Sequence, residues 1–341
     1  MLHHGRRGIL GKPGVESEAI ALSGVTSFIT YRWSSAGLGT TYGVVSIPTS
    51  GVGSGVSFSA DGKALAVATQ GSPYIQVYPW SPATGPGTKY ADPTTLPPAN
   101  PSSEVDVTFS PASDVVLMGH RSSSGRISAY PFNSTTGFGT KYANPASLPA
   151  ANFSSSNVVF SPAGDAVAIG NNFYRWSSAT GFGTKYADPS VLGNERGTAF
   201  SPDGSVVVLT AGGGVLAYPW NSTTGFGTKY ADPTTGIGAE GTAVDFSPAG
   251  DAILVGRDGS FVSTLHVFLW SNATGFGTKF STSGTTAVYC AKFSPNGNSI
   301  AVVFGSGNGL YIYPWSTATG LGTRTIAAGS DAAGMSFRKI P

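Results

Sequence analysis

The sequence has a single cysteine, Cys290, so it can form no intrachain disulfide and no zinc site built from several cysteines. Charged residues make up only 11% of the 341, against roughly 25% in an average soluble domain. The 19 Lys and Arg nearly balance the 17 Asp and Glu, so we expect no nucleic-acid partner, because such binders carry a basic excess. No run of about 18 apolar residues occurs, so we expect no membrane insertion. Gly and Pro follow the first seven residues where a signal peptide would have an apolar stretch, so we expect none.

What the chain does have is repetition. The hexapeptide Gly-Phe-Gly-Thr-Lys-Tyr at 225–230 has counterparts that begin at Gly37, Gly85, Gly137, Gly181, Gly275 and Gly320. The phenylalanine of Phe-Ser-Pro-Asp-Gly at 200–204 recurs as Phe58, Phe109, Phe160, Phe246, Phe293 and Phe337. The aromatic pair Tyr218/Trp220 recurs as Tyr31/Trp33, Tyr78/Trp80, Tyr130/Phe132, Tyr174/Trp176, Phe268/Trp270 and Tyr313/Trp315. Each marker occurs seven times in register, which indicates a sevenfold repeat.

Each repeat reads as four short strands without helical periodicity. In one unit the strands are expected at 198–200, 206–209, 215–220 and 226–230, with Ser-Pro-Asp-Gly as the first turn. The second of these is a continuous aliphatic run, typical of a strand buried on both faces. A four-stranded meander repeated every 44 to 52 residues is typical of a β-propeller blade. The sequence therefore predicts an all-β, seven-bladed β-propeller of four-stranded antiparallel blades.

The repeats also resemble a known family. Ser-Pro-Asp-Gly in the first turn and Trp at the end of the third strand resemble WD-repeat proteins over roughly residues 19–341. The Gly-His pair and the Asp before Trp of that family are absent, so its buried polar network cannot be carried over. The signature Gly-Phe-Gly-Thr-Lys-Tyr-Ala-Asp-Pro resembles the WD-repeat-like propellers of tailed-phage structural proteins. That resemblance implies a component of a phage virion.

The ends of the repeat predict how the ring closes. The first blade starts with its second strand, at 19–22, and lacks an inner strand before it. Residues 334–338 are expected to form an isolated inner strand at the other end of the chain. We expect the C-terminal strand to pair with the N-terminal strands, because closure removes open sheet edges. The alternative uses residues 8–11 as that inner strand, since Leu10 lies 48 residues before Phe58. The domains expected are an N-terminal arm, 1–18, and the propeller, 19–341.

The arm has two interpretations. It is either a solvated terminus, the usual fate of such segments, or an anchor that orders against a partner. In the second case Arg6 and Arg7 would supply charge, and Ile9 and Leu10 an apolar contact.

Several repeated positions could carry chemistry or structure. The six Trp and Phe132 favour packing between blades over a sugar-binding platform. The basic position of the fourth strand (Lys89, Lys141, Lys185, Lys229, Lys279 and Arg324) favours protection of the blade edge over a grip on an anionic polymer. Asp106 and Asp245 lie in predicted inner strands, where they are expected to cap buried backbone groups or point into the channel. Cys290 lies in another and reads as a small buried hydrophobe.

The nonrepeated segments are the candidates for specificity, because a repeat scaffold carries function in its loops. The possible partner-binding residues there are His120, Arg121, Glu195, Arg196, Arg257, Asp258 and Phe261. We find no nucleophile elbow, no clustered histidines and no metal-ligand spacing, so we expect no catalytic residue, no cofactor and no enzyme.

With the resemblance, these observations predict a noncatalytic structural component of a tailed-phage virion, assembled in the host cytoplasm. Its partners would be other virion proteins, bound through the arm, and host surface glycan. The alternative is a carbohydrate-binding module for host recognition.

Overall fold

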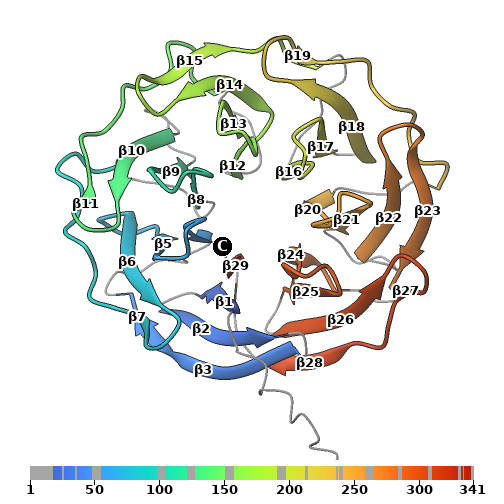
Figure 1. Ribbon diagram of the computed structural model, residues 1–341, viewed down its shortest axis with the longest axis horizontal. Helices are drawn as coiled ribbons and strands as arrows, with labels where there is room; N and C mark the ends of the chain where they lie inside the picture. Colours follow the sequence, from blue (N-terminus) through green and yellow to red (C-terminus); the bar gives the residue numbers. More distant parts are fainter. Residues whose placement is uncertain are drawn as a thin grey trace, which may run out of the picture.

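The computed structural model is a ring of seven sheets around a central channel (Figure 1). It describes residues 18–24, 27–34, 37–47, 55–98, 105–120, 127–149, 157–189, 197–211, 214–235, 237, 241–257, 265–282, 286–305, 309–328, 332 and 334–338. These residues form strands and no helix, so the all-β prediction is confirmed. In the same ranges there is accordingly no helix long and apolar enough to cross a membrane.

The blades are named here in chain order, each from its channel strand outwards. Blade 1 is β29 (Gly334–Arg338), β1 (Glu18–Ser23), β2 (Ser27–Ser34) and β3 (Gly37–Ser46), and blade 2 is β4 (Gly55–Phe58), β5 (Ala64–Ala68), β6 (Ile75–Ser81) and β7 (Gly85–Pro86). Blade 3 is β8 (Val105–Phe109), β9 (Val115–His120), β10 (Ile127–Asn133) and β11 (Gly137–Phe138), and blade 4 is β12 (Val158–Phe160), β13 (Ala166–Ile169), β14 (Asn172–Ser177) and β15 (Gly181–Lys185). Blade 5 is β16 (Gly197–Phe200), β17 (Val206–Ala211), β18 (Gly214–Asn221) and β19 (Gly225–Phe226), and blade 6 is β20 (Gly241–Phe246), β21 (Ala252–Arg257), β22 (Leu265–Ser271) and β23 (Gly275–Ser281). Blade 7 is β24 (Val288–Phe293), β25 (Ser299–Phe304), β26 (Leu310–Ser316) and β27 (Gly320–Leu321), with β28 (Thr325–Ala328) also pairing β26.

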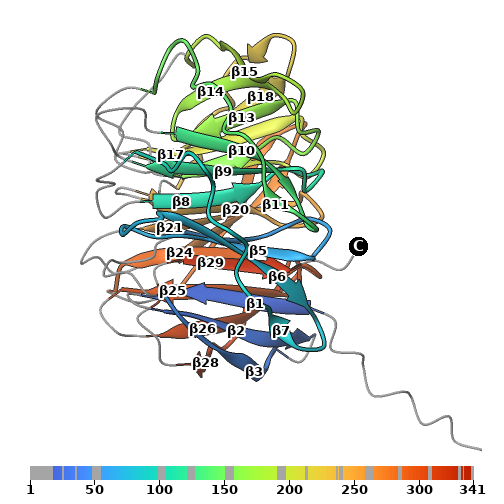
Figure 2. The ribbon, with the colours of Figure 1, turned by 90° about the vertical axis from the view of Figure 1, so that its left-hand side faces the viewer.

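The turn between the first two strands explains why its sequence repeats. In blade 5 the Ser201 hydroxyl accepts a hydrogen bond from the Val206 N–H, at 2.9 Å, and donates one to the Asp203 carboxylate. Gly204 takes φ +71°, a left-handed conformation that glycine adopts without strain. The next strand, β17, is buried from Val206 to Leu209 as expected. Seen from the side, the strands nearest the channel run along its axis, so these turns gather at one end of it (Figure 2).

The aromatic markers pack the blades against one another. Trp220 is 6% exposed and lies edge-on to Phe200 of its own blade and to Tyr186 of the preceding one, with ring centroids 5.4 and 4.9 Å away. The contacts to the preceding blade are Tyr42–Trp80, Tyr90–Phe132, Tyr142–Trp176, Tyr186–Trp220, Tyr230–Trp270 and Phe280–Trp315. The packing interpretation of the tryptophans is therefore confirmed.

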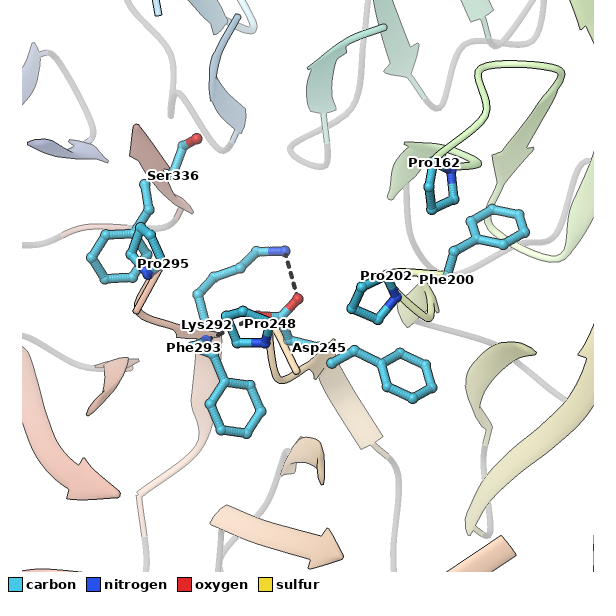
Figure 3. A pocket seen from close by; sticks show the side chains of 11 residues that line it. Pro162, Phe200, Pro202, Asp245, Pro248, Lys292, Phe293, Pro295 and Ser336 are labelled. Atoms are coloured by element: carbon cyan, nitrogen blue, oxygen red, sulfur yellow. Dashed lines mark hydrogen bonds and ion pairs between the residues drawn. The ribbon is translucent and has the colours of Figure 1, made fainter. Parts of the chain in front are cut away.

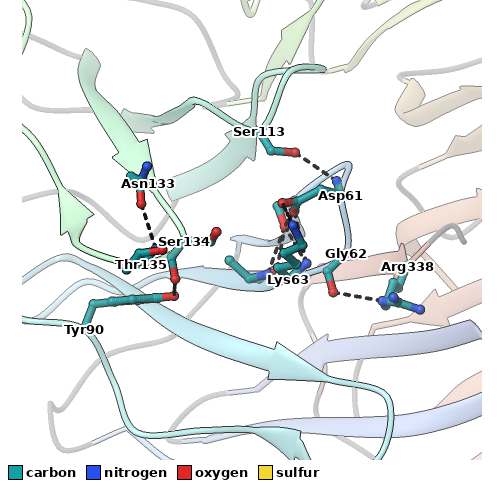
Figure 4. A network of polar contacts seen from close by, with 11 residues as sticks. Asp61, Gly62, Lys63, Tyr90, Ser113, Asn133, Ser134, Thr135 and Arg338 are labelled. Atoms are coloured by element: carbon teal, nitrogen blue, oxygen red, sulfur yellow. Dashed lines mark hydrogen bonds and ion pairs between the residues drawn. The ribbon is translucent and has the colours of Figure 1, made fainter. Parts of the chain in front are cut away.

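The C-terminal strand closes the ring, as predicted. β29 pairs antiparallel with β1 over five residue pairs, from Ala19↔Arg338 to Ser23↔Gly334. Arg338 Nε also donates to the Gly62 carbonyl of blade 2, at 3.0 Å (Figure 4). The same turn is held from its other side, because the Asp61 N–H donates to the Ser113 hydroxyl of blade 3 at 2.9 Å. The proposed arm and the rival strand at 8–11 lie outside the described residues, apart from Glu18 in β1.

The fourth strands differ from the expectation in length. They have two residues in β7, β11, β19 and β27, but ten in β3, five in β15 and seven in β23. The short ones face a third strand that carries proline (Pro79, Pro131, Pro219 or Pro314), and the long ones face Arg32, Arg175 or Leu269 at that position. Proline lacks the N–H that would continue the ladder, so it ends the pairing early.

The outer basic residues pair locally. Lys89, Lys185 and Lys229 form ion pairs with Asp92, Asp188 and Asp232, three residues on, and Lys141 donates to the Asn144 side chain at 2.7 Å. These contacts lie just beyond or at the end of the fourth strands, which agrees with the edge-protecting interpretation.

Candidate functional site

The side chains just before the repeated phenylalanine lie beside the channel, between the inner strands of neighbouring blades. Around the ring they are Ser57, Thr108, Val159, Ala199, Asp245, Lys292 and Ser336. Five of these are small or neutral residues, Ser, Thr, Val or Ala. An acid and a base occupy the other two places, in adjacent blades 6 and 7.

Five polar side chains in or directly before the inner strands cap the next blade. An inner strand is the edge of its sheet, so its outward N–H groups need partners. Each of these bonds joins a side-chain oxygen to an N–H of the next blade: Ser336 to Phe58 at 3.1 Å, Ser57 to Phe109 at 3.4 Å, Asp106 to Val158 at 3.1 Å, Asn157 to Thr198 at 3.1 Å and Asp245 to Phe293 at 2.9 Å. The prediction that Asp106 and Asp245 cap backbone groups is therefore confirmed.

Lys292 is different, because an ammonium group cannot accept such a bond. Its Nζ instead lies 3.8 Å from Asp245 Oδ1, with 41% of the Lys292 side chain and 22% of the Asp245 side chain exposed. The nearby Asp245 carboxylate raises the pKa of Lys292 above its ordinary value, although burial opposes this, so the amine stays charged. Sequence reasoning missed Lys292; the signal was its departure from the small residues at the same position of the other repeats.

The pair sits in a cavity of about 430 Å³ at the end of the channel where the first turns of the blades gather (Figure 3). We call it the channel pocket. It is lined by Pro162, Phe200, Pro202, Asp245, Phe246, Pro248, Lys292, Phe293, Pro295, Ser336 and Phe337. Its volume falls in the range of small-molecule sites, roughly 300–1,000 Å³. Lys292 and Asp245 point toward each other inside it, and the prolines lie around them.

Further titratable groups lie along the same inner strands. Asp106, in blade 3, and Cys290, two residues before Lys292, both interact electrostatically with the Lys292 amine. Burial raises the pKa of the Cys290 thiol to about 11, so it stays protonated at neutral pH. Burial also raises the pKa of Asp106 to about 6, against the opposing effect of its bonds from Val158 and Val107.

Asp106 gives a pH-dependent prediction. Its folded-state pKa of about 6 exceeds the ordinary value of 3.8, so the folded chain holds this proton more tightly than the unfolded chain. The free energy of unfolding therefore falls as the pH rises from about 4 to about 6, and below that window the ionisation penalty is absent. Asp106→Asn removes the ionisation and keeps one acceptor oxygen for the Val158 N–H, as Asn157 keeps one for Thr198 in blade 4, but it gives up the bond from the Val107 N–H. It should still raise the free energy of unfolding at neutral pH, by about 1 kcal/mol, because the removed ionisation penalty exceeds the cost of the lost bond.

Urea unfolding at neutral pH and below about pH 4 checks this, since the variant's gain in stability should be absent in acid, where Asp106 is protonated in the folded wild type. An Asp106→Asn protein no more stable than the wild type at neutral pH would contradict the prediction.

The predicted partner-binding residues are mostly outside the described chain. This holds for Arg6, Arg7, Ile9, Leu10, Arg121, Glu195, Arg196, Asp258 and Phe261. His120 and Arg257 are described, and both are buried last residues of strands, β9 and β21, rather than exposed loop residues. Burial lowers the pKa of His120 to about 4, so it is neutral at physiological pH. Partner binding by the arm and loops stays a prediction, as does the localisation.

Among the described residues, no three His, Cys, Asp or Glu side chains gather closely enough to hold a metal ion. The channel pocket therefore offers its chemistry through Asp245 and Lys292. One is a carboxylate that can accept a proton, and the other is a cation that can stabilise negative charge on an oxygen.

No protein-family model and no curated protein matches the chain. Solved structures match almost all of it in fold. The periplasmic gluconolactonase of Pseudomonas aeruginosa is similar with a TM-score of 0.70 at 17% identity, covering 95% of this chain and 99% of that one. A candidate 6-phosphogluconolactonase of Bacteroides fragilis gives 0.70 at 16%, covering 96% and 100%. A protein of Lactobacillus plantarum gives 0.72 at 14%, covering 95% and 100%.

These neighbours correct the expected function. The prediction of a noncatalytic, tailed-phage virion component, with glycan recognition as its alternative, is wrong, because the similar structures that carry an activity in their names are lactonases. The WD-repeat and phage resemblance rested on the first turn, the third-strand Trp and the fourth-strand signature. All three have structural roles here: Ser201 accepts the Val206 N–H in the turn, and Tyr186 of the fourth-strand signature packs against Trp220 of the next blade. At these identities the comparison establishes the β-propeller fold.

Proposed function

We propose that this protein is a lactone hydrolase whose site is the channel pocket. The observation that carries the proposal is the Asp245–Lys292 pair, the one acid and one base among the residues that line this pocket of about 430 Å³. The lactonase names of the structural neighbours support the same reaction class. The absence of a sequence elbow for a nucleophilic serine agrees with direct attack by water.

The two side chains have separate roles in this reaction. Asp245 Oδ1 accepts a proton from a water molecule, whose oxygen then bonds to the lactone carbonyl carbon. The Lys292 ammonium donates to the carbonyl oxygen, which carries the negative charge of the tetrahedral intermediate. When the intermediate collapses, the ring C–O bond breaks, and the proton passes from Asp245 to the departing ring oxygen. The product is the open-chain hydroxy acid.

The backbone of blade 7 holds the Asp245 carboxylate in place. The Phe293 N–H donates to Asp245 Oδ2 at 2.9 Å, which leaves Oδ1 toward the amine. The separation of 3.8 Å between Oδ1 and Nζ exceeds a direct hydrogen bond, so small polar groups of a substrate or a water can engage both.

The test is hydrolysis of two uncharged lactones, glucono-1,5-lactone and an alkyl-substituted δ-lactone, followed by acid release at constant pH. Asp245→Asn and Lys292→Met should each lower kcat/KM by about 10²-fold, the usual contribution of a proton-transfer or oxyanion-stabilising group. Asp245→Asn keeps an oxygen for the Phe293 N–H, so the fold is retained.

The matched controls are Asp188→Asn and Lys185→Met, which break an ion pair at the end of outer strand β15, away from the channel. They should leave kcat/KM unchanged. Wild-type protein that hydrolyses no lactone faster than buffer, or pocket variants as active as these controls, would refute the proposal.

A further inference from the structure

We infer that the channel pocket takes an uncharged lactone with an apolar substituent and discriminates against phosphorylated sugar lactones. This inference rests on the proposed function for its reaction and on the pocket's own chemistry for its ligand. It separates this chain from the candidate 6-phosphogluconolactonase that its fold resembles.

The first argument is the charge of the pocket. The Lys292 cation is matched by the Asp245 anion 3.8 Å away, and the other lining residues are neutral. Asp106 adds a further carboxylate that interacts with Lys292. A phosphate dianion is held in proteins by several unpaired donors, usually with arginine among them. Here it would meet one cation that is already paired.

The second argument is the rim. Four equivalent turns of blades 4 to 7 present proline at the pocket: Pro162, Pro202, Pro248 and Pro295 (Figure 3). Proline has no N–H, so none of these positions can donate to a phosphate oxygen. Their rings instead offer apolar surface, at least partly exposed in all four. We call these four residues the proline rim.

The remaining residues that line the pocket add no group that would hold a phosphate. The rings of Phe200, Phe246 and Phe293 pack against the tryptophans of their own blades and so lie mainly inside the blades. The Ser336 hydroxyl accepts the Phe58 N–H, and its own O–H is one neutral donor, fewer than the several donors that hold a phosphate dianion.

The charged groups around the proline rim also disfavour a bound phosphate. Asp203 directly follows Pro202, and hydrogen bonds, first that from Ser201, lower its pKa to about 2, so it is ionised. On the β4–β5 turn, the Lys63 amine lies 3.7 Å from Asp61, and Arg338 donates to Gly62. Those two cations are therefore engaged on the blade 1–2 side of the ring.

Two measurements on the whole protein test the inference. The first is binding, measured by calorimetry, of an alkyl-substituted δ-lactam, an uncharged analogue that resists hydrolysis, and of 6-phosphogluconate. The Kd of the lactam should be lower by about tenfold or more. The second compares kcat/KM for the alkyl δ-lactone and for 6-phosphogluconolactone, where the same preference is expected.

A variant in the proline rim tests whether this rim determines the choice of ligand. Pro202→Arg adds a cation and several donors at the pocket, so it should strengthen 6-phosphogluconate binding and weaken lactam binding. Pro111→Arg is the matched control, because Pro111 occupies the same turn position in blade 3 and does not line the pocket. The control should change neither affinity.

The outcomes are distinct. Binding of the phosphorylated ligand as tightly as the lactam, or binding of neither, overturns the inference. Lactam binding that Pro202→Arg weakens, in a protein that hydrolyses no lactone, supports the ligand class and refutes the proposed function instead.

Discussion

Removal of residues 334–341 should lower the midpoint of thermal unfolding by about 10 °C or more. The truncation deletes β29, and with it five residue pairs to β1. It exposes Ile20 and Leu22, which are at most 1% exposed in the closed ring. It also removes the ring contact between Trp33 and Phe337, with centroids 4.9 Å apart. Blade 1 would then have an unpaired inner edge, which favours aggregation as well as unfolding.

A shorter truncation, lacking only residues 339–341, provides the control, because it retains the whole of β29. It should melt within about 2 °C of the full chain. Adding a peptide of residues 330–341 to the longer truncation should restore part of the lost stability. Similar melting temperatures for both truncations would show that β29 does not hold the ring together.

The repeat predicted the fold because the same physical task recurs in each blade. A serine that accepts the N–H of the strand after the turn, as Ser201 does, and a large aromatic between two blades, as Trp220 is, must reappear wherever a blade is built. Ring closure followed from counting strands at the two ends. The lengths of the outer strands were not predicted, because one proline in the third strand decides them.

The candidate site could be predicted only in part, because its residues do not recur from one repeat to the next. Asp245 and Lys292 belong to different repeats, and each departs from the residues at its position elsewhere. Periodicity identifies structure, so residues with a separate function stand out as exceptions to it. The sequence placed Asp245 in an inner strand, yet the pair forms only because adjacent blades bring their inner strands together beside the channel.

Trp220→Ala should lower the free energy of unfolding by about 3–5 kcal/mol, the range for truncating a buried large aromatic. Trp220 contacts four aromatic rings, those of Phe173, Tyr186, Phe200 and Phe226, with centroids between 4.9 and 5.4 Å away. Two of these, Phe173 and Tyr186, belong to the preceding blade, so the cavity left by the indole loosens the contact between blades 4 and 5.

Two variants make that measurement decisive. Trp220→Phe should lower the free energy of unfolding by less, about 1–2 kcal/mol, because blade 3 already has Phe132 at this position and Phe132 is as buried as Trp220. Tyr289→Ala, at a side chain that is 53% exposed, should cost less than about 1 kcal/mol. Denaturant unfolding of the three variants ranks their losses of stability directly. If Trp220→Ala were no worse than Tyr289→Ala, the indole could not be part of the packing between the blades, and the recurrence of tryptophan around the ring would need another cause.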